Sequence, residues 1–221
     1  MSAARFRDRR EAGALLGQRL AQAGLTGDAV VLALPRGGVP VAAEVAEALG
    51  GRFEIFVVRK LGVPGHRELA MGAIASGGIR VMNDNVVASL RISEAEIERV
   101  TAGETEELAR RDALYRGGAP APQLDGRTVV LVDDGLATGA TMRAAVEAVR
   151  EARPGRLVVA VPTGAPATCA ELARMVDDVV CLATPEPFMA VGLSYEDFSP
   201  TTDDEIAELL EQQRGRGQTM R

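Results

Sequence analysis

The sequence predicts an α/β fold built on an open, mainly parallel twisted sheet flanked by helices. Strand-like apolar runs alternate with helical patterns along most of the chain, which is the pattern of α/β domains. The run from Val129 to Val132 is too continuously apolar for a half-exposed strand and suits the centre of a parallel sheet covered on both faces. With 221 residues, 47% of them hydrophobic, the chain can bury one core without splitting. We therefore expect a single domain over residues 1–221.

The alternation assigns most of the elements in order. From the N-terminus we expect a helix, a strand, a helix and a strand, then an interruption, and then three strands and three helices in turn. Their expected ranges are about Arg7–Ala23, Ala29–Leu34, Val39–Leu49 and Glu54–Val58, followed by Thr128–Val132, Thr141–Glu151, Leu157–Val161, Pro166–Met175, Asp178–Leu182 and Asp203–Gln212. A polar C-terminal tail, expected to fray, follows the last helix.

The region between about residues 61 and 122 interrupts the alternation. Two short apolar runs, Leu69–Ile74 and Ile79–Met82, flank the tripeptide SGG and predict a β-hairpin. Ser93 and Glu96 form a capping-box pattern that begins a long polar helix ending near Tyr115. For the long helix, a decorative or dimer-forming arm is one interpretation.

Chemistry-bearing residues follow the apolar run at Val129. Asp133 and Asp134 leave the predicted strand at the sheet edge where open α/β folds bind ligands. The small residues that follow let backbone N–H groups close around an anion, and the next helix adds its positive dipole end. The segment therefore predicts a phosphate at the helix start and a polyol or a metal at the two acids. The alternative is a solvated turn in which Asp and Thr only cap the helix.

The segment VVLVDDGLATGAT resembles the phosphoribosyl pyrophosphate (PRPP) signature of the type I phosphoribosyltransferases. The overall order of motifs also resembles a bacterial subgroup described only as phosphoribosyltransferase-like, and this resemblance covers nearly the whole chain. The resemblance implies the type I fold, with transfer of the 5-phosphoribosyl group of PRPP to a nitrogenous base, a purine favoured, and release of pyrophosphate. It further implies that the insertion at residues 61–122 carries a lid that closes over the substrate and excludes water, with the hairpin and the loop before it favoured as the lid. It also implies Mg²⁺, held in part indirectly by the two acids. Asp133 and Asp134 match the catalytic acids that hold the ribose hydroxyls. The 5′-phosphate loop is matched by Ala137, Thr138, Gly139, Ala140 and Thr141.

Two further segments are expected at the same edge. Leu34-Pro35-Arg36-Gly37-Gly38 resembles the family's pyrophosphate loop, which often contains a non-proline cis peptide, and implies pyrophosphate contacts from Arg36, Gly37 and Gly38. Lys60 is the only lysine of the chain and is expected at the end of the second strand, where its compact charge suits a phosphate. The resemblance implies that Lys60 and Arg67 contact pyrophosphate and contribute to catalysis.

The C-terminal segment Phe188–Phe198 resembles the base-binding segment of hypoxanthine and guanine phosphoribosyltransferases, with one extra residue between Phe188 and Gly192. It implies a base site with Phe188 stacking and Tyr195 or Asp197 supplying polar contacts; the alternative is a hydrophobic clasp on the core. The expected organisation is a core at about residues 24–60 and 123–185, the insertion at 61–122 and a hood at about 185–212.

Composition excludes several other classes of protein. The net charge of −6 disfavours a nucleic-acid surface, and the local arginine cluster at residues 5, 7, 9 and 10 is interpreted as a solvated helix face. Cys169 and Cys181 have neither the number nor the spacing of a metal site or a disulfide framework, so buried free thiols are expected. Without a membrane-length apolar run or a signal-peptide core, a cytoplasmic location is expected, and a homodimer is compatible with the sequence.

Three alternatives to a transferase stay open at this stage. A PRPP-binding regulator without transferase activity would keep the same site. A PRPP synthetase-like protein or a non-catalytic structural homologue is the second alternative, and the third is another enzyme on the same fold that hydrolyses or phosphorolyses a ribosyl compound.

Overall fold

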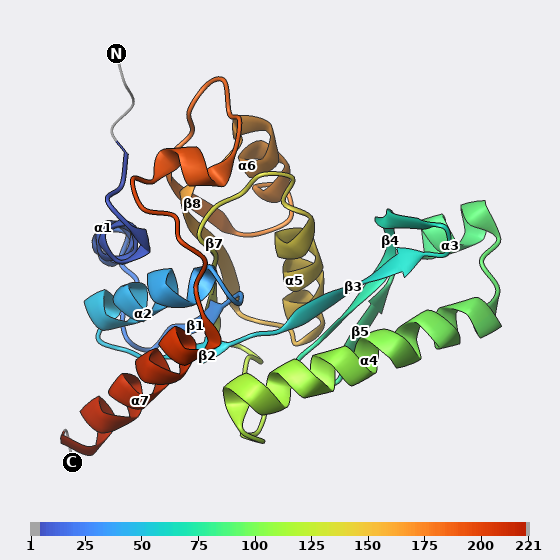
Figure 1. Cartoon of the computed structure of the whole chain (residues 1–221), viewed down its shortest axis with the longest axis horizontal. Helices are drawn as coiled ribbons and strands as arrows, with labels where there is room; N and C mark the ends of the chain where they lie inside the picture. Colours follow the sequence, from blue (N-terminus) through green and yellow to red (C-terminus); the bar gives the residue numbers. More distant parts are fainter. Residues whose placement is uncertain (1–4, 220–221) are drawn as a thin grey trace.

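The computed structural model describes residues 5–219, apart from the side chains of residues 67, 68 and 216–219. Its centre is a parallel sheet of five strands, which confirms the predicted fold class (Figure 1). The strand order is β2 (Phe53–Ile55), β1 (Val30–Ala33), β6 (Thr128–Val132), β7 (Arg156–Thr163) and β8 (Asp178–Ala183). The carboxyl ends of β1 and β6 therefore lie next to each other in the middle of the sheet.

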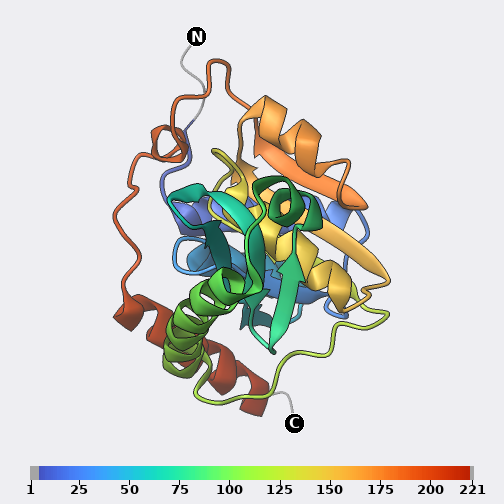
Figure 2. The same ribbon diagram turned by 90° about the vertical axis from the view of Figure 1, so that its right-hand side faces the viewer.

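Helices cover both faces of this sheet (Figures 1 and 2). Side chains alternate between the faces of a strand, so Val130 and Val132 of β6 pack with one apolar cluster while Val129 and Leu131 pack with the other. The first cluster includes α1 (Arg9–Gln22), α2 (Gly38–Leu49) and α7 (Asp203–Thr219), and the second includes α5 (Ala140–Glu151) and α6 (Pro166–Leu172). This double cover explains why β6 is apolar at every position after its first.

The insertion is a second, antiparallel sheet with two helices, and it projects from the core in Figure 1. It contains β3 (Val58–Val63), β4 (His66–Ala75), β5 (Ile79–Met82), α3 (Asp84–Leu90) and α4 (Glu94–Arg116). The predicted hairpin is confirmed as β4 and β5. The capping box is confirmed by hydrogen bonds in both directions between Ser93 and Glu96. The small sheet packs against α5, and α4 lies along β3 and β4.

The predicted strand Glu54–Val58 is wrong in its extent. The chain leaves the core sheet after Ile55 and enters the second sheet at Val58, so one apolar run serves two sheets. Phe56 donates its N–H to the carbonyl of Ala33, and Val57 donates to the hydroxyl of Ser76, so the switch keeps its backbone groups paired.

The last helix is longer than predicted: α7 continues to Thr219, past the predicted end at Gln212. The amide of Gln213 accepts a hydrogen bond from the N–H of Phe53 at 2.7 Å and donates one to its carbonyl at 3.0 Å. This contact anchors α7 on the edge strand β2. The hydroxyl of Tyr115 donates to Asp203 at 2.8 Å and joins the end of α4 to the start of α7. No helix within residues 5–219 is long and apolar enough to cross a membrane.

Candidate active site

The two loops predicted to bind phosphate groups meet at the carboxyl edge of the core sheet. The N–H of Leu34 donates to the carbonyl of Val132 at 2.9 Å, which extends the pairing of β1 and β6 to the point where both strands end. Residues 35–38 and 133–141 therefore leave the sheet side by side. The peptide bond between Pro35 and Arg36 is cis, as the resemblance implied.

Glycines let these loops touch. A Cβ atom at Gly37 would lie 2.0 Å from Oδ2 of Asp134, closer than any real contact. A Cβ atom at Gly38 would lie 2.7 Å from the carbonyl oxygen of Val132 and 2.9 Å from Cα of Asp133. The side chain of Arg36, from the same loop, is exposed. The sequence therefore places glycine where the pyrophosphate-like loop approaches the acidic pair.

The two carboxyl groups crowd each other in a largely buried position. Burial raises the pKa of Asp133 well above its usual value, and the charge of Asp134 raises it further. Burial also raises the pKa of Asp134, although the guanidinium of Arg9 opposes this effect. Oδ1 of Asp133 accepts the N–H of Asp134 at 2.9 Å. Two ionised carboxylates in this position require positive charge or hydroxyl donors from a ligand.

Arg9 is a residue of this site that the sequence analysis missed. Its Nε donates to Oδ2 of Asp134 at 2.9 Å, and its side chain is only 11% exposed. Its Nη1 donates to the carbonyl of Ser199 at 2.7 Å, and its guanidinium lies 4.0 Å from the ring centre of Phe198. The interpretation of this arginine as part of a solvated helix face is wrong. No local signal could have found it, because its partner lies 125 residues along the chain.

The predicted 5′-phosphate loop leads into the N-terminus of α5. Gly139 has φ +70°, and a Cβ atom there would lie 2.5 Å from Cγ2 of Thr168, so this position requires glycine twice over. Oγ1 of Thr168 donates to the carbonyl of Ala137 at 2.7 Å, and Nη1 of Arg143 donates to the carbonyl of Thr138 at 2.9 Å. Protein donors therefore satisfy the carbonyls of Ala137 and Thr138. The N–H groups of the first turn of α5 have no helical carbonyl to bind and can donate to an anion.

The hood contacts the acidic segment directly. The buried Tyr195 donates its hydroxyl proton to the backbone carbonyl of Asp134 at 2.6 Å and stacks on Phe198 at 5.1 Å between ring centres. A Cβ atom at Gly135 would lie 2.5 Å from Val191 in the 3-10 helix η1 (Val191–Ser194). Tyr195 therefore holds Asp134 from the hood side. Its hydroxyl proton is donated to this carbonyl, and its oxygen keeps the capacity to accept a hydrogen bond.

The other two predicted base-site residues are more exposed than the buried Tyr195. Asp197 is exposed, and its Oδ1 accepts from the N–H of Ser199 at 2.9 Å and from its hydroxyl at 2.6 Å. Phe188 is half-buried in the segment between β8 and η1, beside the strongly exposed Met189.

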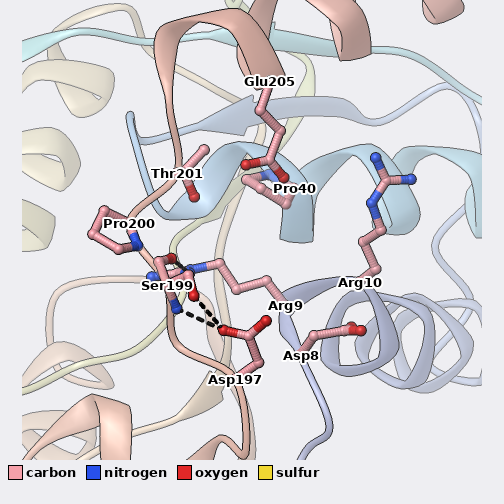
Figure 3. Close-up of a pocket in the computed structure, with 9 residues that line it drawn as sticks. All are labelled: Asp8, Arg9, Arg10, Pro40, Asp197, Ser199, Pro200, Thr201 and Glu205. Atoms are coloured by element: carbon pink, nitrogen blue, oxygen red, sulfur yellow. Dashed lines mark hydrogen bonds between the residues drawn. The ribbon is translucent and has the colours of Figure 1, made fainter.

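A cavity of about 200 Å³ opens between α1 and the hood (Figure 3). In Figure 3 Arg9 extends from α1 toward Ser199, between the helix and the hood segment. The cavity is lined by Asp8, Arg9, Arg10, Pro40, Asp197, Ser199, Pro200, Thr201 and Glu205. The cavity therefore lies where residues 197–205 face the start of α1.

The structure corrects the expected position of Lys60. This residue lies inside β3, opposite Ala73 of β4, and not at the end of a core strand. Its side chain is half-buried. Arg67 belongs to β4, and its side chain lies outside the part of the chain that the structure describes. Both residues belong to the second sheet, where the sequence analysis expected a lid.

The two cysteines are neighbours, and both are partly exposed rather than buried. A Cβ atom at Gly164 would lie 2.7 Å from Sγ of Cys169 and 3.4 Å from Sγ of Cys181. A hydrogen bond from the Cys181 thiol lowers the pKa of Cys169 to about 7, and the same pairing together with burial raises the pKa of Cys181. Both thiols are free, as predicted.

We expect Cys169 to be alkylated by iodoacetamide faster than Cys181. Because a lowered pKa supplies thiolate at lower pH, the rate at Cys169 should rise with pH around a midpoint near 7. Cys181→Ala removes the hydrogen-bond donor and should move this midpoint toward the usual value of about 8.5. Mass spectrometry of the labelled peptides measures both rates. Equal rates at the two thiols, or a midpoint that Cys181→Ala leaves unchanged, would contradict the prediction.

Comparisons with known proteins agree with this geometry. The model of the Phosphoribosyl transferase domain matches residues 8–195. A Mycobacterium tuberculosis H37Rv protein, provisionally named a phosphoribosyl transferase, is 49% identical over 207 residues, which are 93% of this chain and 46% of that protein. The chain therefore spans about half the length of this relative. The crystal structure of TT1426 from Thermus thermophilus has a TM-score of 0.86 and 45% identity, covering 95% of this chain and 99% of that one. An orotate phosphoribosyltransferase of Streptomyces coelicolor is 41% identical over 90 residues, covering 40% of this chain and 48% of that protein.

Proposed function

Since this chain belongs to the phosphoribosyl transferase family and has the type I fold, we propose that it transfers the 5-phosphoribosyl group of PRPP to a nitrogenous base and releases pyrophosphate. The observation that carries this proposal is the meeting of three features at one sheet edge: a crowded acidic pair, a glycine loop that touches it, and an open helix N-terminus. A polyol that carries a phosphate at one position and a pyrophosphate at another satisfies all three. We further propose that the base is a purine, with Phe188 as the stacking residue.

Each part of the site has a role in this reaction. The N–H groups of residues 137–141 bind the 5′-phosphate, and Asp133 and Asp134 accept hydrogen bonds from the ribose hydroxyls. The loop of Arg36, Gly37 and Gly38 binds the leaving pyrophosphate. The C1–O bond to pyrophosphate breaks while the base nitrogen forms its bond to C1, so catalysis depends on positioning and on neutralising the leaving group.

The acidic pair also fits a magnesium ion. Its oxygen atoms are the ligands that Mg²⁺ prefers. Burial raises the pKa of both carboxyl groups, and repulsion by Asp134 raises the pKa of Asp133 further, an effect that a bound cation would oppose. Among the described residues, no group of three or more His, Cys, Asp or Glu could hold a metal ion. Asp133 and Asp134 would therefore hold Mg²⁺ in part through water, with substrate oxygens completing its shell. Bound Mg²⁺ supplies charge that stabilises the departing pyrophosphate.

A panel of bases incubated with PRPP and Mg²⁺, and read by pyrophosphate release, tests this function. Release with at least one purine, lost in Asp133→Asn/Asp134→Asn, is the expected result. Phe188→Ala should raise the KM of that purine several-fold, since stacking contributes on the order of 1 kcal/mol, and should leave PRPP binding intact. PRPP binding without release for any base would instead support a PRPP-binding regulator. The absence of PRPP binding would overturn both functions.

Lys60→Met should weaken pyrophosphate binding by about 1.5 to 3 kcal/mol, the size of one charged hydrogen bond. The reason is that Lys60 is the compact cation of the second sheet, which we propose closes over the pyrophosphate. Lys60→Arg should restore only part of the affinity. Isothermal titration with pyrophosphate and Mg²⁺ measures the change, and full affinity in Lys60→Met would remove the lysine from the site.

A further inference from the structure

The acidic pair is held by residues that lie outside the loop carrying it. Of the two carboxylates, Asp134 has its Oδ2 bound by Nε of Arg9 and its backbone carbonyl bound by the hydroxyl of Tyr195. These partners come from opposite ends of the chain, α1 and the hood. The orientation of Asp134 is thus set by tertiary contacts.

Arg9 is itself fixed on three sides. Its Nε meets Asp134, its Nη1 meets the carbonyl of Ser199 at 2.7 Å, and its planar face meets the ring of Phe198 at 4.0 Å. Only a guanidinium can make these three contacts together, because an ammonium has no planar face and no forked donors. The ion pair is also shielded, with side chains 11% and 16% exposed, so solvent screens it less than a surface pair.

We propose that Arg9 is a positioning residue for PRPP binding, which holds one oxygen of Asp134 so that the other is presented to the ribose. The inference rests on the proposed function. One oxygen of Asp134 is committed to Nε of Arg9, and the remaining oxygen is left for a sugar hydroxyl or a magnesium-bound water. Without Arg9 the carboxylate would rotate freely and lose this arrangement.

Arg9 also contacts the hood, through its hydrogen bond to the carbonyl of Ser199. Ser199 lies in the segment that joins η1 to α7, and its N–H and hydroxyl both bind Asp197. The guanidinium therefore connects Asp134 to the segment between η1 and α7, which is separate from the segment of Phe188, the residue proposed to stack on the base. Helix α1 belongs to the active site and is more than a cover for the sheet.

The test is isothermal titration of PRPP with Mg²⁺ into the full chain and three variants. Arg9→Met should weaken PRPP binding about tenfold, the loss of one charged hydrogen bond. Arg9→Lys should recover part of this loss, because one donor can still reach Asp134. Arg19→Met is the matched control, since Arg19 is an exposed arginine on the same helix, and it should leave the affinity unchanged.

Separate measurement of the KM for PRPP and the KM for the base distinguishes a positioning role of Arg9 from misfolding of the hood. Arg9→Met should raise the KM for PRPP and leave the KM for the base within about twofold, whereas a misfolded hood would impair both. If Arg9→Met folds poorly, Phe198→Leu removes the ring that lies beneath the guanidinium and stacks on Tyr195, and it should raise the KM for PRPP by a smaller factor.

Three outcomes would overturn the inference. Unchanged PRPP affinity in Arg9→Met, with normal binding by the unaltered protein, would overturn the role of Arg9 alone. Tighter binding would mean that Arg9 competes with the ribose for Asp134, which is the opposite role. No PRPP binding by the unaltered protein would overturn the proposed function, and the role of Arg9 with it.

Discussion

Replacing Asp133 and Asp134 together by asparagine should abolish most PRPP binding while leaving the protein at least as stable at pH 7. Each substitution keeps the shape of the side chain and removes a charged hydrogen-bond acceptor. Two lost charged hydrogen bonds of about 1.5 kcal/mol each correspond to a decrease in affinity on the order of 100-fold. Isothermal titration with PRPP and Mg²⁺ measures this change.

The stability of this double variant follows from the pKa values. Folding raises the pKa of both carboxyl groups, chiefly by burial. A carboxyl group with a raised pKa makes the folded state less stable as the pH rises from the unfolded value of about 3.9 through the folded value. At pH 7 the wild-type protein therefore carries this cost, and the asparagine variant does not. Below about pH 3.9 the groups are protonated in both states and the difference should vanish.

Thermal unfolding at about pH 7 and about pH 3, above and below the unfolded value of about 3.9, measures the second half of this prediction. A Tm of the double variant equal to or above that of the wild type at pH 7 shows that the lost binding does not come from misfolding. Unaltered PRPP affinity in the well-folded variant would remove the acidic pair from the site. A marked fall in Tm at pH 7 would show instead that the pair stabilises the fold.

The core could be predicted from sequence because its strands are buried on both faces. The strand Thr128–Val132 was predicted with the bounds of β6, since an uninterrupted apolar run ends abruptly at two acids. The capping box likewise predicted the start of α4 from local hydrogen bonding between Ser93 and Glu96. Such features depend on neighbouring residues, and these the sequence shows directly.

The errors arose where contacts between distant segments decide the structure. Residues 53–63 form one largely apolar run, and nothing local indicates that the chain changes sheets between Ile55 and Val58. The turn between β3 and β4 did carry a signal, because Pro64-Gly65 is typical of a turn and Gly65 has φ +80°. Interpreting that dipeptide would have predicted β3 and placed Lys60 within a hairpin.

In the candidate site, too, features within one short motif were predicted and contacts between distant segments were not. The acids and the glycine loops were predicted because each lies within one short motif. The ion pair of Arg9 with Asp134 and the contact between Cys169 and Cys181 join separate elements, and these were not predicted. Their partners are brought together only after the sheet, α1 and α6 have packed.

Gly37→Ala should also remove most PRPP binding, with little effect on stability. The backbone of Gly37 has φ −59° and ψ −33°, which alanine adopts readily, so the substitution causes no backbone strain. Its methyl group would, however, lie 2.0 Å from Oδ2 of Asp134, the atom that Nε of Arg9 binds. The carboxylate must rotate away and lose the position proposed for the ribose. We expect a loss of roughly tenfold or more in PRPP affinity, as for one charged hydrogen bond.

Alanine substitutions at two other glycines serve as controls for Gly37→Ala. At Gly38 the added methyl group would meet backbone atoms of Val132 and Asp133, so Gly38→Ala should lower the Tm as well as the affinity. At Gly103, inside α4, nothing lies within 4 Å, so Gly103→Ala should raise stability by up to about 1 kcal/mol through helix propensity and leave PRPP binding unchanged. Titration with PRPP and thermal unfolding of the three variants compare these effects. Wild-type affinity in Gly37→Ala would mean that Asp134 binds the ribose from a different rotamer or does not bind it at all.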